Sequence, residues 1–163
     1  MIELSPQPLT KAGFGPFGDV VEIAGADRLE INQGFAARFN GFATIDVGDQ
    51  GGVPGTCIIV AQPRPQPIAI KVMERHPLSS QLFYPLQTTP WIVLVCIDPS
   101  DVYSYQAFIT NGRQGVNYAK ATWHHPLLVT EKDSGFFEVS RLGEGKNLEE
   151  VWLETEISLR LTA

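Results

Sequence analysis

The sequence predicts an all-β fold, a sandwich or barrel of about ten strands with a few short helices. Short runs rich in β-branched and aromatic residues recur along the chain between turn-forming residues. The 15 glycines and 12 prolines are spread through the chain instead of forming one linker. No stretch of the sequence keeps apolar residues at the helical period over three turns. Together these observations favour sheets over helices.

The first half of the chain is predicted to form one short helix and four strands. The helix is expected at residues 9–14, before the first strand. Each strand is an apolar or β-branched run between turn signals, and the four span residues 19–23, 35–47, 56–61 and 67–75.

The second half contains the most apolar run of the sequence, WIVLVCI at residues 91–97, which predicts a buried strand. Asp and Ser in residues 98–101 can cap a turn directly after it. The glycine-rich loop at residues 109–115 predicts a hairpin turn, or a place where the backbone approaches a ligand. The remaining strands share the β-branched or aromatic pattern and span residues 81–86, 103–109, 124–130, 136–140 and 157–161.

Length and charge restrict the classes of protein. The 163 residues fit one domain, spanning residues 1–163, that needs neither disulfides nor a structural metal for stability. The net charge of −6 and the lack of a basic run argue against a nucleic-acid partner. The apolar run at residues 91–97 is far shorter than the ~20 residues of a membrane-spanning helix, so no membrane association is expected.

The start of the sequence and the cysteines predict a cytoplasmic protein. MIELSPQPLT has no apolar signal core. Cys57 and Cys96 each lie in an apolar run, which predicts two buried, non-catalytic cysteines and no disulfide.

One strand places two ionisable side chains on the same face. In residues 67–76 (PIAIKVMERH), strand alternation puts Glu74 and His76 in line with an apolar row of Ile68, Ile70 and Val72. If that row faces the core, the two polar groups lie at its open end, where burial is costly unless they are hydrogen-bonded or bind a metal. The pattern therefore indicates a site at a pocket mouth, with an exposed strand end as the alternative.

The other two histidines are neighbours. His124 and His125 point in opposite directions if residues 123–128 form a strand, so only one of them is expected to face inward. Spacing alone does not choose between them, and a histidine pair before proline also occurs at ordinary strand starts.

Several motifs resemble those of the ureidoglycolate lyase family of allantoin catabolism. They are EINQG (residues 30–34), ERHPLSSQLFYPL (74–86) and AFITNGRQGVNYAKATWHHPL (107–127), with PFGDVVE (16–22) and AQPRPQPIAIKVMERHP (61–77) in the expected order. The resemblance extends over nearly the whole chain. It implies a cupin-like β-barrel, a homodimer, and cleavage of (S)-ureidoglycolate to glyoxylate and urea.

The resemblance also implies the site. Cupins commonly bind a metal through His-x-His followed by Glu and a later His, whereas this chain has Glu74-x-His76 followed by Gln81. Aligning Ala121 with the glycine of the second cupin motif selects His124 as the inward histidine. Glu74, His76 and His124 are then the expected catalytic group and the ligands of a divalent metal, if one is bound, with Ni²⁺ the ion that the resemblance suggests. No organic cofactor is expected.

The expected reaction is an acid–base elimination. A base removes the hydroxyl proton and an acid protonates the departing nitrogen. We expect His124 or Glu74 to act as the base, His76 as its proton-transfer or metal-binding partner, and Gln81 as a hydrogen-bonding group for the substrate.

The anionic substrate also needs a cation. Arg38 is the leading candidate because of its spacing from the Asn32-Gln33-Gly34 motif in the resemblance, while Lys71 and Arg75 lie on the opposite strand face from Glu74. The complete set of expected substrate-binding residues is Arg38, Gln81, Asn32, Asn117, Tyr118 and His125.

Two other functions remain open. A non-catalytic sensor would use the same pocket to bind glyoxylate or a related small acid. A cupin isomerase or dioxygenase would normally carry a fuller set of metal ligands than this chain offers.

Overall fold

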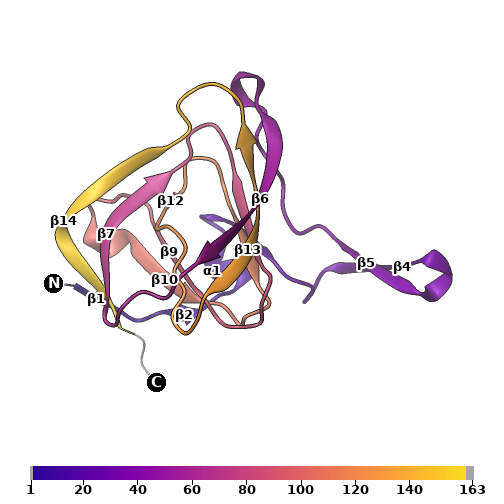
Figure 1. Cartoon of the computed structure of the whole chain (residues 1–163), viewed down its shortest axis with the longest axis horizontal. Helices are drawn as coiled ribbons and strands as arrows, with labels where there is room; N and C mark the ends of the chain where they lie inside the picture. Colours follow the sequence, from indigo (N-terminus) through magenta and orange to yellow (C-terminus); the bar gives the residue numbers. More distant parts are fainter. Residues whose placement is uncertain (1, 161–163) are drawn as a thin grey trace.

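Two large, mostly antiparallel sheets and a projecting two-stranded arm make up the computed structural model, which describes residues 2–160 (Figure 1). The larger sheet has the order β1-β14-β7-β12-β9-β10-β2 and consists of β1 (Ile2–Leu4), β2 (Gln7–Pro8), β7 (Ile68–Arg75), β9 (Ile92–Cys96), β10 (Tyr105–Ile109), β12 (Trp123–His124) and β14 (Glu149–Leu159). The smaller sheet has the order β3-β11-β8-β13-β6 and consists of β3 (Gly18–Val21), β6 (Val53–Ala61), β8 (Gln81–Pro85), β11 (Gly115–Tyr118) and β13 (Ser134–Leu142).

The predicted all-β class is confirmed. Two sheets that face each other across a core are the arrangement of double-sheet jelly rolls such as cupins. Within residues 2–160 the helical elements are short, and none is long and apolar enough to cross a membrane. They are α1 (Lys11–Phe14), η1 (Asn32–Gly34), η2 (Asp49–Gly51) and η3 (Val102–Ser104).

Both predicted helical turns are present. Helix α1 lies within the predicted residues 9–14, and the Thr10 hydroxyl caps it by accepting a hydrogen bond from the Gly13 N–H. The turn expected after residues 98–101 is η3, where the Asp101 carboxylate accepts from the Tyr103 N–H at 3.0 Å.

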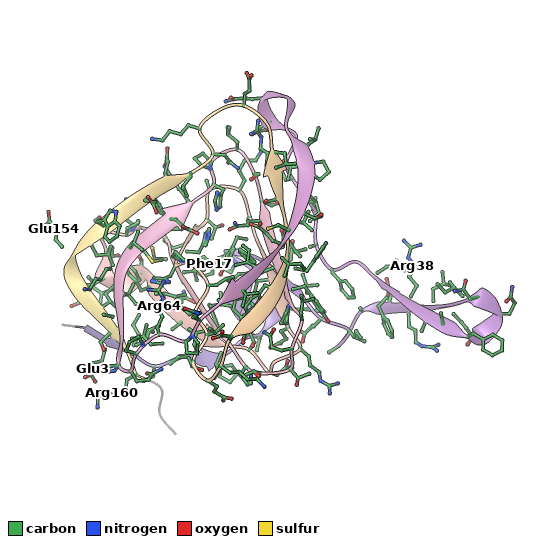
Figure 2. All side chains as sticks on the ribbon, in the orientation of Figure 1. Glu3, Phe17, Arg38, Arg64, Glu154 and Arg160 are labelled. Carbon is green, nitrogen blue, oxygen red and sulfur yellow. The ribbon has the colours of Figure 1, made fainter. Side chains whose placement is uncertain are left out.

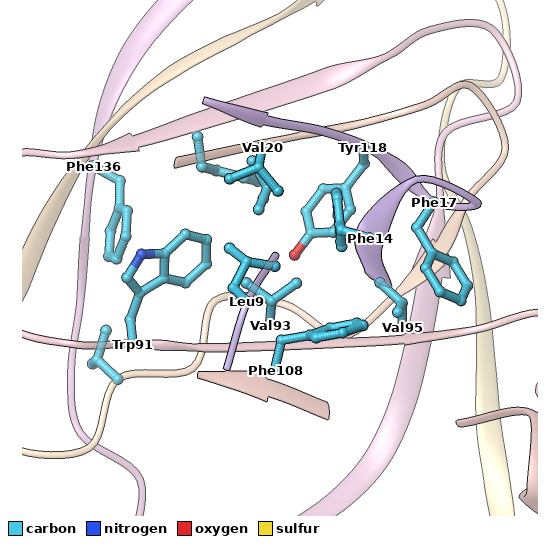
Figure 3. Close-up of a cluster of buried hydrophobic side chains, with 13 residues drawn as sticks. Leu9, Phe14, Phe17, Val20, Trp91, Val93, Val95, Phe108, Tyr118 and Phe136 are labelled. Carbon is cyan, nitrogen blue, oxygen red and sulfur yellow. The ribbon is translucent and has the colours of Figure 1, made fainter. Parts of the chain in front are cut away.

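A cluster of buried apolar side chains joins the facing sheets (Figure 3). The Trp91 and Phe136 rings meet edge to face with centroids 4.9 Å apart, and Val93 and Val95 of β9 belong to the same cluster. Burying each of these side chains contributes about 1.5–3 kcal/mol. This core fixes the sheet separation and hence the shape of any cavity between them.

A second cluster packs against the other face of β9. It contains Ile92, Leu94 and Cys96, which alternate along β9 with Val93 and Val95 of the first cluster. Strand β9 is therefore buried on both faces, as its continuous apolar run predicted.

The alternation in β7 is not regular, contrary to the sequence prediction. Met73 is fully buried in the same cluster as Ile68 and Ile70, so the inward face changes between Ile70 and Met73. The pairing of β7 with β14 is interrupted at this point, because the register jumps between Trp152 and Ile157. As a result, Glu74 and His76 face away from the row formed by the first two isoleucines.

Two predicted strands are shorter than expected. The strand predicted at residues 35–47 is limited to β5 (Ala36–Asn40), because Gly41 follows with a φ of 80°. The strand predicted at 124–130 ends at His124, since Pro126 has no N–H to donate to a ladder, and only an isolated bridge from Leu128 to Ile92 follows.

Other predicted strands differ at their ends or were missed. The strand predicted at residues 157–161 belongs to the longer β14, and residue 161 lies outside the described residues. The missed strands are β1, β2, β4 (Asp27–Ile31) and β11.

Strands β4 and β5 pair only with each other and form the arm, which projects from the body of the molecule (Figure 1). We call residues 27–40 the arm below. Its tip contains η1 and Phe35, whose side chain is 92% exposed.

Candidate functional site

Glu74, His76 and His124 converge at the end of β7. Glu74 and His124 lie directly opposite each other on the neighbouring antiparallel strands β7 and β12. His76 is the first residue after β7, two residues, or one strand period, from Glu74. Directly opposite residues put their side chains on the same face of a sheet. One nitrogen or oxygen atom from each of the three side chains lies within 4.8 Å of the others. Three residues expected to act together therefore form one cluster.

His124 is buried, and both its ring nitrogens and its ring face contact neighbouring groups. Its Nδ1 lies 2.9 Å from the Thr122 carbonyl oxygen and its Nε2 lies 3.1 Å from Gln81 Oε1. Glu74 Oε1 is 3.4 Å from the same Nε2. The ring stacks on Tyr118 at 4.0 Å between centroids. Because both ring nitrogens face oxygen acceptors, this geometry suits a protonated imidazole, which donates from both nitrogens.

A buried carboxylate that sequence reasoning missed orients Gln81. Gln81 Nε2 donates to Glu138 Oε1 at 2.7 Å, which leaves Gln81 Oε1 for His124. The signal was present, since Glu138 shares a strand face with the buried Phe136 in the predicted strand at residues 136–140.

The other oxygen of Glu138 accepts a hydrogen bond from the Cys57 thiol at 2.8 Å. This bond, together with burial, raises the pKa of Cys57 to about 11. Cys57 is exposed, contrary to its predicted burial, whereas Cys96 is buried as predicted.

His76 offers a free ring nitrogen to the cluster. Its Nδ1 donates to the backbone carbonyl of Asn147 at 2.7 Å, and its buried Nε2 has no hydrogen-bond partner within residues 2–160. Burial and the charge of His124 lower the pKa of His76 despite the bond to Asn147. His76 is therefore a neutral imidazole with an available lone pair on Nε2.

Glu74 is kept ionised by its neighbours. Burial acts to raise its pKa, but the hydrogen bond and charge of His124, together with His76 and His125, outweigh burial and lower the pKa below the ordinary value. A carboxylate thus faces two imidazoles within one small volume.

A cavity of about 310 Å³ opens beside this cluster. Larger hollows of about 590 and 570 Å³ exist elsewhere, but no residue of the cluster lines them, whereas Glu74 lines the smaller cavity, so we assign the site to the smaller cavity. Glu74 and Gln81 line this cavity, and Arg64 is the basic residue of its wall. The full lining is Ile59, Ala61, Gln62, Arg64, Glu74, Gln81, Phe83, Pro126 and Leu127.

Arg64 lies within the motif at residues 61–77 but was not among the expected site residues. It lies in the proline-rich loop between β6 and β7, where no strand or helix periodicity assigns a direction to a side chain. Only the folded loop, in which the Arg64 N–H donates to the Val129 carbonyl at 3.3 Å, brings it to the cavity wall.

Both neighbouring histidines are buried, contrary to the expectation that only one would face inward. The chain leaves strand geometry after His124, so alternation no longer applies to His125. His125 Nδ1 donates to the Pro126 carbonyl at 2.7 Å, and its buried Nε2 has no partner within the described chain. Burial, partly offset by the bond to Pro126 and aided by the charge of Arg64, lowers the pKa of His125 to about 4.

The expected contacts Asn117 and Tyr118 lie on opposite faces of β11. Tyr118 faces the cluster through its stacking on His124, and burial raises its pKa. The Asn117 amide instead donates to Asp19 Oδ2 at 3.1 Å and to the Thr44 carbonyl at 3.0 Å. Asn117 therefore joins β11 to β3 and to the loop after the arm.

Arg38 and Asn32 are not brought to the cluster within one chain. Both are exposed on the arm, and Figure 2 shows Arg38 on the arm while Arg64 lies in the body. Sequence spacing placed them in a motif, but it gave no information about the direction of the arm.

The cluster has the donor set of a divalent-metal site. One carboxylate and two imidazoles suit several borderline ions. The Nε2 atom of His76 has no hydrogen-bond partner within the described residues, so its lone pair is available to bind a metal. Its Nδ1 bonds to a backbone carbonyl, which is a contact that commonly orients metal-binding histidines. The residues present therefore fit a metal.

Comparison with known proteins covers the entire described chain. A family model described as ureidoglycolate lyase matches residues 1–160. The ureidoglycolate lyase of Burkholderia mallei (strain NCTC 10229) is 45% identical, with 100% of both chains covered. That of Pseudomonas syringae pv. syringae (strain B728a) is 42% identical over 92% of this chain and 89% of the relative.

A solved structure of Bacillus subtilis oxalate decarboxylase aligns with 67% of this chain and 27% of its own, at 12% identity and a TM-score of 0.43. The relatives are matched over almost their full length and at far higher identity. Together with the family model, these full-length matches show that the chain belongs to the ureidoglycolate lyase family.

Proposed function

We propose that this protein is a ureidoglycolate lyase that cleaves (S)-ureidoglycolate to glyoxylate and urea in allantoin and purine catabolism. Family membership over residues 1–160 supports the substrate and the reaction. The observation that carries the proposal is the convergence of Glu74, His76 and His124 within 4.8 Å beside a cavity of suitable size for a small hydroxy acid.

The chemistry needs two proton transfers. In ureidoglycolate the hydroxyl and the ureido nitrogen share one carbon. Removal of the hydroxyl proton lets the C=O bond of glyoxylate form while the C–N bond breaks, and a proton delivered to the nitrogen releases neutral urea. A neutral base and a protonated acid placed near one carbon suffice.

The hydrogen bonds assign these roles as part of the proposal. His76 is the base, because its Nε2 lone pair has no partner and its pKa is lowered. His124 is the acid, because both of its nitrogens face acceptors and Glu74 stabilises the imidazolium. Glu74, which the sequence also left open as the base, here stays ionised and stabilises the protonated ring of His124. After each turnover the proton taken up by His76 returns to His124, which restores both starting forms. Gln81 and Tyr118 position the His124 ring, and Gln81 reaches the cavity wall.

A divalent metal, with Ni²⁺ as the proposed ion, would be held by Glu74, His76 and His124. The two imidazoles would then serve as ligands, and the base and acid roles given above apply to the metal-free protein. When bound, the metal would polarise substrate oxygens and orient the carboxylate and hydroxyl. His124 Nε2 is hydrogen-bonded to Gln81 Oε1 in this structure, so this hydrogen bond would be lost if His124 bound a metal through Nε2.

The test is incubation of the purified protein with racemic ureidoglycolate. We expect urea and glyoxylate in equal amounts, consumption of one enantiomer, and no ammonia. Ammonia as the first product would indicate an amidohydrolase instead. Binding of glyoxylate without turnover would support the sensor, and absence of both would reject the proposal.

The metal requirement is tested in the same assay. Chelation is expected to abolish urea release, and restoration with individual divalent ions should recover it best with Ni²⁺. Undiminished turnover after chelation, with metal content below one ion per ten chains, would restrict catalysis to the side chains.

We also propose that the protein acts in the cytoplasm as a single-domain homodimer. Two free thiols suit a reducing compartment. A second copy would cover the outer face of the smaller sheet, where Ile58 and Val60 of β6 are 56% and 63% exposed.

A further inference from the structure

We propose that Arg64 binds the carboxylate of the substrate in the cavity beside Glu74. This inference rests on the proposed function, because it takes an anionic hydroxy acid as the ligand. It replaces Arg38 as the expected cation and assigns a specificity role to a loop residue that was not among the expected site residues.

The first observation is the place of Arg64 on the cavity wall. Arg64, Glu74 and Gln81 line the same cavity of about 310 Å³. A substrate that fills this volume therefore contacts a guanidinium on one side and the acid–base cluster on another.

The second observation is that the guanidinium is available. The Arg64 backbone is fixed by the N–H bond to the Val129 carbonyl. Its side chain makes no ion pair with any carboxylate described in residues 2–160. Arg64 therefore has a fixed backbone and a guanidinium without an ion pair. Such a group can bind an anion without first breaking an existing ion pair.

The third observation is that five other basic side chains are engaged elsewhere, and that the lining of the cavity includes no basic residue besides Arg64. Arg75 pairs with Glu149 at 2.6 Å and its guanidinium lies over the Trp123 ring. Arg141 donates to backbone carbonyls of Asp49 and Glu144. Three further basic residues are held by a carboxylate or a carbonyl, and these are Lys11, Lys120 and Arg160.

Charge also favours this assignment. Glu74 lines the cavity and Glu138 lies directly behind Gln81, so two carboxylates repel an anionic substrate. A guanidinium on the cavity wall offsets that repulsion. It can donate two parallel hydrogen bonds to a carboxylate, which fixes the orientation of the substrate as well as its position. The carbon bearing the hydroxyl and ureido groups is then directed towards Glu74 and its imidazoles.

The experiment compares Arg64→Ala with two matched variants, Arg113→Ala at an exposed position in the loop between β10 and β11 and Arg38→Ala on the arm. We expect Arg64→Ala to raise KM for ureidoglycolate about 10- to 100-fold, with a smaller change in kcat, because charge-assisted hydrogen bonds are lost. Inhibition by the product glyoxylate should weaken by a similar factor. Arg113→Ala should match the wild type, and Arg64→Lys should recover part of the loss.

The methyl ester of ureidoglycolate separates carboxylate binding from a general disturbance of the cavity. With this uncharged substrate, wild type and Arg64→Ala should have similar kcat/KM values. An equal loss with the ester would overturn the inference, as would an unchanged KM in Arg64→Ala or a larger effect of Arg38→Ala. Each of these results presupposes an active wild-type enzyme, so absence of urea release by the wild type is a separate failure, that of the proposed function.

Discussion

At the scale of single residues, Glu74 is the charge on which the cluster depends. Its carboxylate lies 3.4 Å from Nε2 of His124 and is itself held ionised. Glu74→Gln keeps the shape but removes the charge, so we expect kcat for urea release to fall about 100-fold or more, within the range of positioned acid–base catalysis. The measurement is urea release at saturating substrate, with circular dichroism to show that the fold is retained.

The matched control is Glu154→Gln, the same change at an exposed carboxylate on β14, at the edge of the view in Figure 2, that is not part of the cluster. It should leave kcat unchanged. If Glu74→Gln turns over as fast as this control, Glu74 has no part in the mechanism.

His125 makes stability depend on pH. The unfolded chain binds a proton on this imidazole below its ordinary pKa of 6.5, whereas the folded chain does so only near pH 4. The unfolded state therefore gains stability as pH falls from about 6.5 to 4, and the folded protein loses about 3 kcal/mol from this group. Urea unfolding at neutral pH and at pH 4 measures the loss.

The variant His125→Gln isolates this contribution from those of the carboxylates. It should be less stable at neutral pH, because the imidazole packs in the core, but its stability should fall by about 3 kcal/mol less over the same window. Parallel losses in variant and wild type would mean that His125 is protonated in the folded state well above pH 4.

At the scale of elements, the sequence predicted what depends on local alternation. Glu74 and His76 lie two residues apart, and a two-residue period was enough to place them together. The change of face between Ile70 and Met73 was not predictable, because it coincides with a break in the pairing with β14, a strand about 80 residues later. Local pattern carries no information about a distant partner's register.

The same limit explains the other differences at the site. Arg64 reaches the cavity through a loop fold and not through a strand period, and His125 is buried because Pro126 ends the ladder. Glu138 could have been found, since a charged residue between core positions is a detectable exception. Sequence therefore located the ionisable cluster but not the residues that surround it.

The loop between β10 and β11 offers a test of tertiary constraint. Gly112 has a φ of 84°, and a Cβ there would collide with the Thr88 carbonyl. The hairpin predicted at residues 109–115 is wrong, because this loop connects strands of the two different sheets. Gly41 has a similar φ of 80° with nothing within 4 Å. Gly41→Ala should cost about 1–2 kcal/mol from backbone conformation alone, and Gly112→Ala clearly more. Chemical denaturation of both variants measures the difference, and equal costs would contradict the collision.

At the scale of the whole molecule, the outer face of the smaller sheet is unusually apolar. Antiparallel sheets that face water normally carry polar residues there. Here Ile58 and Val60 of β6 are 56% and 63% exposed, and Tyr84 and Phe137 border an apolar hollow of about 530 Å³. The arm adds Phe35 at its tip, and an isolated two-stranded hairpin is only marginally stable in water. A second copy of this chain packed on the same face would cover both features.

This arrangement predicts a dimer that depends on the outer face of β6. The wild type should show a mass of twice 17.9 kDa by light scattering after gel filtration. The double variant Ile58→Lys/Val60→Lys places two charges in the interface without touching the core, because Ile59 and Ala61 are the residues that pack inward. It should be a folded monomer, since burying unpaired charges opposes association.

Tyr103→Lys, at a residue 94% exposed on η3, should remain dimeric. A double variant that stays dimeric would show that the two copies meet through another surface, and a monomeric wild type would remove the need for the apolar face to be covered by a second copy.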